Sequence, residues 1–236
     1  MGVTGGVGID GDQWAQCAQA RGWLWNAAVS GVNGPRSNTL ILAHGAGAPM
    51  DSEWMTGMAE RLAARGVSVL RFEFPYMAQR RLDGGKRPPN PQVKLFECWR
   101  EVYAEVRRHV TGPLAIGGKS MGGRMASLLA DELGADRLVC LGYPFYAAGK
   151  PEKPRVAHLA ELQTPTLILQ GERDALGNRQ AVEAYTLAPG IELSWYVAGD
   201  HDLKPLKASG FTHEQHLDAA ADNIAHWLKN PPTCSR

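Results

Sequence analysis

The sequence feature that most constrains the fold is a glycine–serine turn near the middle of the chain. Residues 118–122 read Gly-Lys-Ser-Met-Gly, between an apolar run at residues 114–117 and a helical pattern over residues 121–133. A turn from strand to helix within so few residues needs small neighbours and puts the serine into a strained backbone conformation. The N-terminus of the following helix then favours negative charge beside the serine hydroxyl. The pattern predicts that Ser120 is an exposed nucleophile.

The rest of the chain alternates between short apolar runs and segments of helical periodicity. The apolar runs predict strands at residues 23–29, 39–43, 67–74, 114–117, 138–142, 166–170 and 191–197. Helical spacing is found at residues 52–65, 94–110, 121–133 and 179–187, and in a C-terminal segment with Leu217, Ala220, Ala221, Ile224, Trp227 and Leu228 on one face. Such alternation predicts a mainly parallel sheet with helices on both faces. Together with the serine turn, it predicts an α/β-hydrolase fold with a minimal lid or none.

Length, charge and cysteine content place the chain among single-domain enzymes without metals. The 236 residues fit one domain, with a glycine-rich segment at residues 1–12 that we expect to be flexible and a tail at residues 230–236. A net charge of +1 predicts neither nucleic acid nor a membrane surface as a partner. No signal peptide and no membrane-spanning run are recognisable. The four cysteines lack metal-ligand spacing, which predicts reduced thiols in a cytoplasmic protein and no metal site.

A serine nucleophile needs a base and an acid that orients the base, and the chain offers both. Asp174 follows the strand predicted at residues 166–170, and His201 follows the next strand, in the order Ser, Asp, His. Because parallel strands end at one edge of the sheet, we expect Ser120, Asp174 and His201 to meet there as a catalytic triad. Glu172 stays open as an alternative acid. Contact of the imidazole with Asp200 or Asp202 is a further alternative.

Acyl transfer also requires amide donors for the tetrahedral oxyanion. We expect one from the backbone N–H of Met121, which follows the nucleophile, and one from Ala46 or Gly45 in the loop after the early strand. His44, in the same loop, is predicted to brace it by hydrogen bonding. Lys119 is predicted to pack its stem behind the turn and to pair with a carboxylate rather than act as the base.

Two groups of side chains are candidate substrate contacts. Aromatic and proline residues that follow two of the strands are consistent both with an acyl pocket and with packing under loops: Phe74, Pro75, Tyr76, Tyr143, Pro144 and Phe145. A loop predicted at residues 75–91 also carries four cations, Arg80, Arg81, Lys86 and Arg87. Such a run of cations is usually a solvated surface, and the alternative is that it recognises a substrate with a carboxylate or phosphate group.

Five segments carry a resemblance to a known family. The most specific is Gly117-Gly118-Lys119-Ser120-Met121-Gly122-Gly123-Arg124, and the others lie at residues 42–47, 71–76, 142–145 and 171–174. From about residue 39 to the C-terminal helix, the chain resembles small α/β-hydrolases related to the testis-expressed protein 30 family. It is more distantly similar to dienelactone hydrolases, which have a cysteine in place of Ser120. The resemblance implies a hydrolase fold without cofactor or large lid, leaves the substrate open, and includes relatives that are subunits of protein assemblies.

The sequence therefore predicts a serine hydrolase of carboxylesterase type that cleaves small esters or thioesters through an acyl-enzyme on Ser120. Its expected partner is a small-molecule acyl substrate, and the sequence does not indicate an oligomeric state. Two alternatives from other classes stay open. One is a catalytically silent binding or scaffold protein with the same fold, and the other is an acyltransferase or serine peptidase that uses the same triad.

Overall fold

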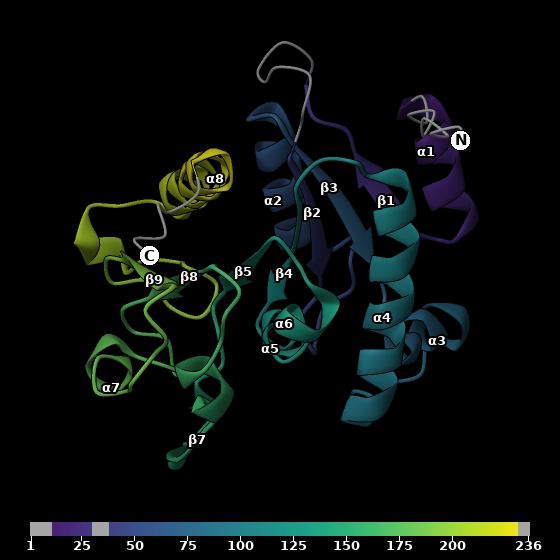
Figure 1. The fold of residues 1–236 in the computed structure, drawn as a ribbon. Helices are drawn as coiled ribbons and strands as arrows, with labels where there is room; N and C mark the ends of the chain where they lie inside the picture. The colour runs from purple at the N-terminus through teal and green to yellow at the C-terminus, as the bar shows by residue number, and fades with distance from the viewer. Residues whose placement is uncertain (1–10, 30–37, 231–236) are drawn as a thin grey trace.

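The computed structural model describes residues 11–29 and 38–230, which form a central seven-stranded sheet (Figure 1). The strand order is β1-β3-β2-β4-β5-β8-β9. The strands are β1 (Leu24–Asn26), β2 (Asn38–Ala43), β3 (Val67–Phe72), β4 (Leu114–Lys119), β5 (Arg137–Leu141), β8 (Thr166–Gly171) and β9 (Ile191–Tyr196). Only β1 pairs antiparallel within this sheet; every other neighbouring pair is parallel. The mainly parallel sheet expected from the sequence is therefore confirmed.

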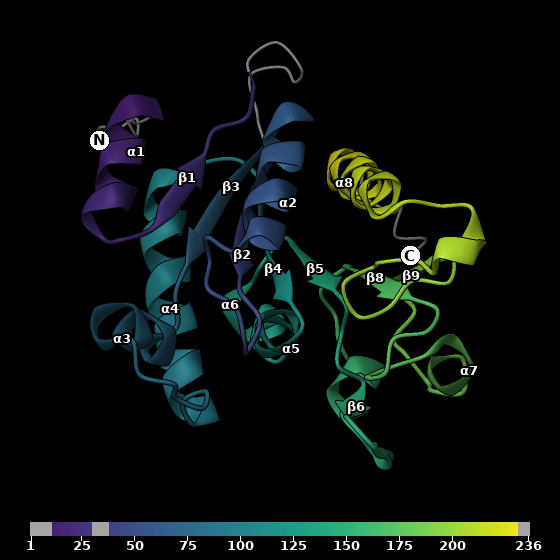
Figure 2. The ribbon, with the colours of Figure 1, turned by 180° about the vertical axis from the view of Figure 1, so that it is seen from behind.

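Helices cover both faces of this sheet. On one face, α2 (Glu53–Ala64) and α8 (His213–Lys229) contact each other (Figures 1 and 2). The opposite face carries α1 (Gly11–Ala20), α3 (Pro75–Asp83), α4 (Gln92–His109), α5 (Met121–Ser127), α6 (Ala130–Leu133) and α7 (Arg179–Val182). Along β2, Leu40 and Leu42 join the core under α2 and α8, whereas Ile41 and Ala43 join the other core, as a strand period of two requires. Of the helices described here, none has the length and apolar character that crossing a bilayer requires.

The segment predicted as a loop at residues 75–91 contains the helix α3. Pro75 stands in its first turn, where the missing N–H of proline costs nothing, and Gly84 ends it with φ 69°. Proline at the start and a left-handed glycine at the end are a common pair of helix boundaries. Pro75 and Gly84, which suggested a loop in the sequence, therefore mark the two ends of a helix.

The N-terminal part of the chain contains a helix that the sequence did not predict. The segment predicted as flexible at residues 1–12 overlaps α1, which starts at Gly11 and buries Trp14 and Ala18 against the core. Residues 1–10 lie outside the described part, as do residues 231–236.

Near the middle of the chain, the single helix predicted at residues 121–133 is divided into α5 and α6.

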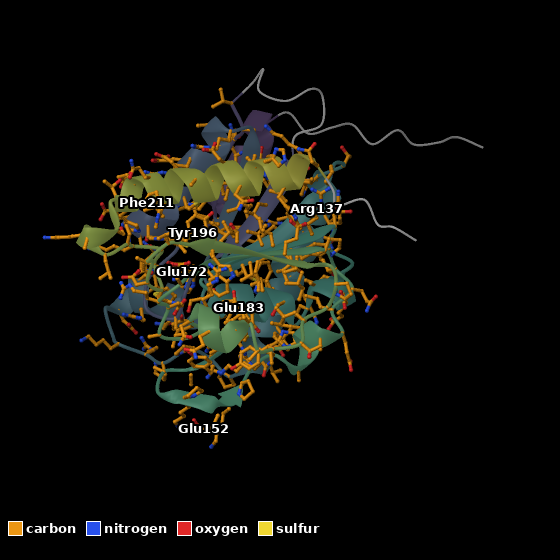
Figure 3. The ribbon with its side chains drawn as sticks, turned by 90° about the vertical axis from the view of Figure 1, so that its left-hand side faces the viewer. Arg137, Glu152, Glu172, Glu183, Tyr196 and Phe211 are labelled. Atoms are coloured by element: carbon orange, nitrogen blue, oxygen red, sulfur yellow. The ribbon has the colours of Figure 1, made fainter. Side chains whose placement is uncertain are left out.

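The long connection between β5 and β8 forms a small hairpin instead of a lid domain. It consists of β6 (Tyr146–Ala147) and β7 (Lys150–Pro154), followed by one short 3-10 helix, η1 (Ala157–Ala160). The hairpin projects from the body of the molecule, with Glu152 near its tip (Figure 3). This agrees with the predicted minimal lid.

Close backbone packing at the serine turn generates a stability prediction. A Cβ on Gly118 would lie 2.6 Å from the backbone of Gly122 and 2.7 Å from the carbonyl oxygen of Ala43. Because backbone atoms cannot move aside individually, Gly118→Ala should lower the free energy of unfolding by about 2 kcal/mol or more. The melting temperature should then fall by about 4–8 °C, measured by scanning calorimetry. Gly190→Ala, whose Cβ would meet nothing closer than 4.0 Å, is the control. Equal melting temperatures for the two variants would contradict the prediction.

Candidate active site

The candidate site lies where several parallel strands end at one edge of the sheet. Ser120 directly follows β4, and Asp174 lies three residues after β8. His201 lies beyond β9, and the loop of residues 44–47 follows β2. Since these strands run parallel, their carboxyl ends bring the four segments together, as is usual for sites in α/β proteins.

Ser120 has the strained backbone that the glycine–serine pattern predicts. Its φ is 52° and its ψ −117°, in a region that residues with side chains rarely occupy. Two hydrogen bonds hold this conformation. The Ser120 N–H donates to the Leu141 carbonyl at 2.9 Å, and the Ser120 carbonyl accepts from the Arg124 N–H at 3.0 Å. The side chain is thereby held, partly exposed, at the N-terminus of α5.

The three residues of the predicted triad form a continuous chain of hydrogen bonds. His201 Nε2 lies 2.8 Å from Ser120 Oγ, and His201 Nδ1 lies 2.7 Å from Asp174 Oδ2. Asp174 is fully buried, and its carboxylate also accepts the Leu176 N–H and the Gln170 amide, both at 2.8 Å. These contacts fix the carboxylate as the acceptor for Nδ1–H, which leaves Nε2 free to accept the serine proton.

The alternative acids have other partners. Glu172, at the start of the loop after β8 (Figure 3), pairs with Arg179 at 3.0 Å. Asp200 accepts the backbone N–H of Asp202 at 2.9 Å. Asp202 in turn pairs with Lys119 at 3.1 Å. Within the part of the chain described here, Asp174 is the carboxylate that contacts the imidazole.

The choice of acid can be tested by amide substitution. Asp174→Asn preserves the shape of the side chain but removes the charge that holds the imidazole tautomer, so kcat on a p-nitrophenyl ester should fall by about 10³–10⁴-fold. Glu172→Gln removes an equal charge nearby and should change kcat by less than about twofold. A large loss in Glu172→Gln with little loss in Asp174→Asn would reverse the assignment. Melting curves of both variants control for folding.

Lys119 occupies a buried position behind the serine turn. Its ammonium donates to the His201 carbonyl at 2.7 Å, pairs with Asp202, and lies 5.6 Å from the ring centre of Trp54. Burial lowers the pKa of Lys119, and the negative charge of Asp202 opposes this effect. The predicted pairing with a carboxylate is confirmed, and the contact with the His201 backbone helps to hold the imidazole in place.

Two buried side chains brace the loop after β2. His44 Nδ1 donates to the Gly45 carbonyl at 2.6 Å, while Nε2 accepts the Phe74 N–H at 3.1 Å. These partners define the neutral tautomer, and burial lowers the pKa of His44, so the ring stays uncharged. The Tyr76 hydroxyl donates to the carbonyls of Ala46 at 2.9 Å and Gly45 at 3.3 Å. Burial raises the pKa of Tyr76 to about 12, so this donor keeps its proton at neutral pH.

The candidate oxyanion donors lie beside Ser120. Met121 begins α5, and Ala46 lines both cavities next to the serine. Gly45 packs against the turn, since a Cβ added there would lie 3.7 Å from the Ser120 Cβ. Within residues 11–29 and 38–230, the N–H groups of Ala46 and Met121 have no acceptor. Both amides are therefore free to bind a substrate oxygen.

The bracing by Tyr76 leads to a kinetic prediction. Tyr76→Phe removes both hydrogen bonds to the loop carbonyls, so the amides of Gly45 and Ala46 should be held less firmly. We expect kcat to fall by about fivefold, one charge-free hydrogen bond being worth about 1 kcal/mol, with little change in KM. Tyr103→Phe removes a comparable hydrogen bond, to the carbonyl of Gly134 just after α6, and should leave kcat unchanged. A rise in KM at constant kcat would contradict a role in holding the loop.

The aromatic residues predicted for the acyl pocket lie beneath the site. Phe74, Tyr76, Tyr143 and Phe145 are at most 2% exposed, and Pro75 lies exposed at the start of α3. None of these five lines a cavity that Ser120 borders, whereas Pro144 does. Large apolar rings just after a strand are drawn into the core. Packing under the loops is therefore observed for the four aromatic residues, and a place in the cavity wall for Pro144.

Within the described part of the chain, Ser120 borders two cavities. The first encloses about 450 Å³ and is lined by Ala46, Asn90, Gln92, Leu95, Ser120, Met121, Arg124, Met125, Pro144, Ala147, Ala148, Arg155 and Leu176. The second encloses about 480 Å³ and is lined by Gly45, Ala46, Gly47, Ala48, Ser52, Glu53, Trp54, Met55, Lys119, Ser120, His201 and Asp202. Most of these residues are not predictable from the sequence. Arg124 could have been predicted as a neighbour of Ser120, because it lies one helical turn after it.

The basic segment at residues 80–87 does not reach either cavity. Arg81 pairs with Asp51 at 2.8 Å and with Glu73 at 2.5 Å, and Arg87 pairs with Asp83 at 2.6 Å. Of the two interpretations, a charged surface segment is the one observed, and recognition by these cations of an anionic substrate at Ser120 is wrong. Acidic neighbours brought close by α3 already neutralise Arg81 and Arg87, and no residue of the segment borders Ser120.

The parallel sheet and the strained serine turn are those of the α/β-hydrolase class. Residues 36–229 match the family described as alpha/beta hydrolase domain, and the chain belongs to this family. No protein in the curated set matches it.

Solved structures of similar fold support this assignment. They include a lidless α/β serine hydrolase from Xanthomonas campestris (TM-score 0.64, 20% identity, 89% of this chain and 90% of that chain). Est1E from Butyrivibrio proteoclasticus has a TM-score of 0.63 at 16% identity, over 88% and 94% of the two chains. A dienelactone hydrolase from Anabaena variabilis has a TM-score of 0.61 at 20% identity, over 83% and 87%. At these identities the likeness concerns the fold, and the predicted α/β-hydrolase fold is confirmed.

Proposed function

We propose that the protein is a serine hydrolase of carboxylesterase type that cleaves small esters or thioesters. The observation that carries the proposal is the hydrogen-bond chain from Ser120 Oγ through His201 to the buried Asp174, with distances of 2.8 and 2.7 Å. A serine hydroxyl is a weak nucleophile unless a base removes its proton, and this chain supplies the base in the required tautomer. Two free amides beside the serine add the oxyanion donors.

The proposed reaction proceeds in two half-reactions. His201 Nε2 accepts the Ser120 proton as Oγ attacks the acyl carbonyl carbon, and the amides of Met121 and Ala46 bind the resulting oxyanion. The imidazolium then gives its proton to the leaving alcohol or thiol, and the acyl group remains on Ser120. A water molecule, deprotonated by His201, releases the acid and restores the serine. Asp174 stabilises the imidazolium throughout.

The site dimensions and the cysteines support the finer parts of the proposal. The cavities beside Ser120 enclose about 450 and 480 Å³, which suits small acyl and leaving groups. Cys17, Cys98 and Cys140 are free thiols, in keeping with a cytoplasmic protein. A relationship to the testis-expressed protein 30 family remains a prediction from the sequence motifs.

The proposal is tested by covalent labelling with a fluorophosphonate probe, read by intact mass and peptide mapping. We expect one adduct, on Ser120, because the probe reacts with an activated serine. His201→Ala should slow the labelling by about a thousandfold or more, since the base is lost. His226→Ala, an exposed histidine of α8, is the control and should label at the wild-type rate.

Other labelling results would redirect the proposal. Folded protein that gives no adduct at Ser120 would favour a catalytically silent binding or scaffold protein. An adduct that forms equally fast in His201→Ala would exclude the proposed base. If labelling succeeds, product analysis with competing amine and alcohol acceptors, and with peptides, separates hydrolysis of esters from acyl transfer and peptidase activity.

A further inference from the structure

The two cavities beside Ser120 differ in charge. The first cavity, which we call the arginine cavity, contains Arg124 and Arg155 and no carboxylate among its lining residues. The second contains Lys119 together with Glu53 and Asp202. Only the arginine cavity therefore combines an unbalanced positive charge with direct access to the serine.

Arg124 is half-buried and lacks the protein partners that three other cations of this fold have. Arg71 and Arg137 donate to backbone carbonyls, and Lys119 pairs with Asp202. The guanidinium of Arg124 has no hydrogen bond or ion pair to any described residue, and its Nε is buried without an acceptor. A half-buried guanidinium without a protein partner has lost part of its hydration uncompensated, so an anionic ligand fits this arrangement.

Among the described residues, the side chains around Arg124 offer no counter-charge. His158 Nε2 is hydrogen-bonded to the Ser127 hydroxyl at 2.9 Å. Burial lowers the pKa of His158 to about 4, with a smaller contribution from Arg124. It is therefore uncharged at neutral pH. Burial also raises the pKa of Tyr143 far above neutrality, so that hydroxyl stays protonated.

Arg155 supplies a second cation from the β6–β7 hairpin. Its backbone is fixed on both sides: its N–H donates to the Phe145 carbonyl at 2.6 Å, and its carbonyl accepts from the Tyr143 hydroxyl at 3.0 Å. Its side chain is exposed and has no hydrogen-bond or ion-pair partner among the described residues. The residue directly after the hairpin thus adds a second unpaired guanidinium to the lining of the arginine cavity.

The position of His201 indicates which part of a substrate enters the arginine cavity. His201 lines the second cavity but not the arginine cavity. Because the imidazolium must protonate the leaving group, the leaving alcohol or thiol belongs in the second cavity. The acyl group then extends on the other side of Ser120, towards Arg124 and Arg155.

We propose that the acyl group carries a carboxylate, held by Arg124 and Arg155, so that the enzyme cleaves half-esters or half-thioesters of short dicarboxylic acids. The inference rests on the proposed function. Ser120 Oγ bonds to the ester carbonyl carbon, the leaving oxygen or sulfur takes the proton from His201, and water releases the free dicarboxylate. A carboxylate can accept hydrogen bonds from two N–H groups of one guanidinium at once. A neutral acyl chain offers no such pair of acceptors. Arg124 lies about 6 Å along the helix axis from Ser120, so acyl chains of four or five carbons are the natural probes.

The first test compares monomethyl glutarate with methyl pentanoate, which share a five-carbon acyl chain and differ in the terminal carboxylate. Wild type should prefer the half-ester, measured as the ratio of the two kcat/KM values by pH-stat titration. Arg124→Met should reduce this ratio by at least about tenfold, since it removes a charged hydrogen bond. Arg80→Met removes an equal charge outside both cavities and should keep the wild-type ratio. A ratio that is the same in wild type and Arg124→Met would overturn the proposal.

The second test measures binding without turnover, with glutarate and the Ser120→Ala variant in a calorimeter. Glutarate should bind to Ser120→Ala, and adding Arg124→Met should weaken this binding by at least about tenfold. Pentanoate, which lacks the second carboxylate, is the matched ligand and should bind more weakly. Ligand-free Arg124→Met should melt no lower than wild type, because the substitution removes an unpaired charge.

The two tests separate the inference from the function beneath it. If wild type hydrolyses neutral esters but glutarate does not bind in an Arg124-dependent way, the carboxylate site is wrong and the hydrolase proposal stands. If glutarate binds through Arg124 but no ester is cleaved and Ser120 is not labelled, the hydrolase proposal fails while the anion site stands.

Discussion

The backbone conformation of Ser120 is the constraint on which the rest of the site depends. A positive φ at a residue with a side chain persists only where its surroundings determine it. Here α5 approaches β4 and the end of β2 so closely that a Cβ on Gly118 or Gly122 would lie 2.6 Å from backbone atoms. The same turn sets the serine hydroxyl, the Met121 amide and, one helical turn on, Arg124. Nucleophile, oxyanion donor and candidate anion site therefore share one rigid frame.

Most of the fold could be predicted because its signals are local. Buried parallel strands appear as continuous apolar runs, and the glycines around Ser120 mark a turn that few structures need. The helix at residues 75–83 was missed because glycines and prolines were counted as loop formers without regard to position, although Pro75 and Gly84 stand where helices begin and end. The first helix was missed because the glycine-rich residues before it suggested disorder, whereas Trp14 is held by long-range packing.

The triad and the pocket walls show which parts of a site a sequence contains. Asp174 and His201 could be named because strand order alone brings strand ends together. The pocket walls depend on which side chains turn inward after a strand, and Tyr143 and Phe145 pack against each other in the core. Recognition of an anionic substrate was considered for Arg81 and its neighbours because a sequence shows which residues are charged. It does not show that Arg81 pairs with Asp51 and Glu73. A free cation is defined by the absence of partners, which only the tertiary structure reveals.

The placement of Arg124 links binding energy to the reacting atoms. A guanidinium far from the serine would hold an anionic substrate but leave its carbonyl free to move, so binding would lower KM without raising kcat. Arg124 lies on α5, whose first residue carries a free amide beside Ser120, so the proposed acyl carboxylate would be positioned relative to both the attack and the proposed oxyanion geometry. Partial burial of the unpaired guanidinium costs some of its hydration in the free protein, and the proposed bound carboxylate would offset that cost. A stability cost of this kind is expected at functional sites, where local rules of charge pairing are broken for a ligand.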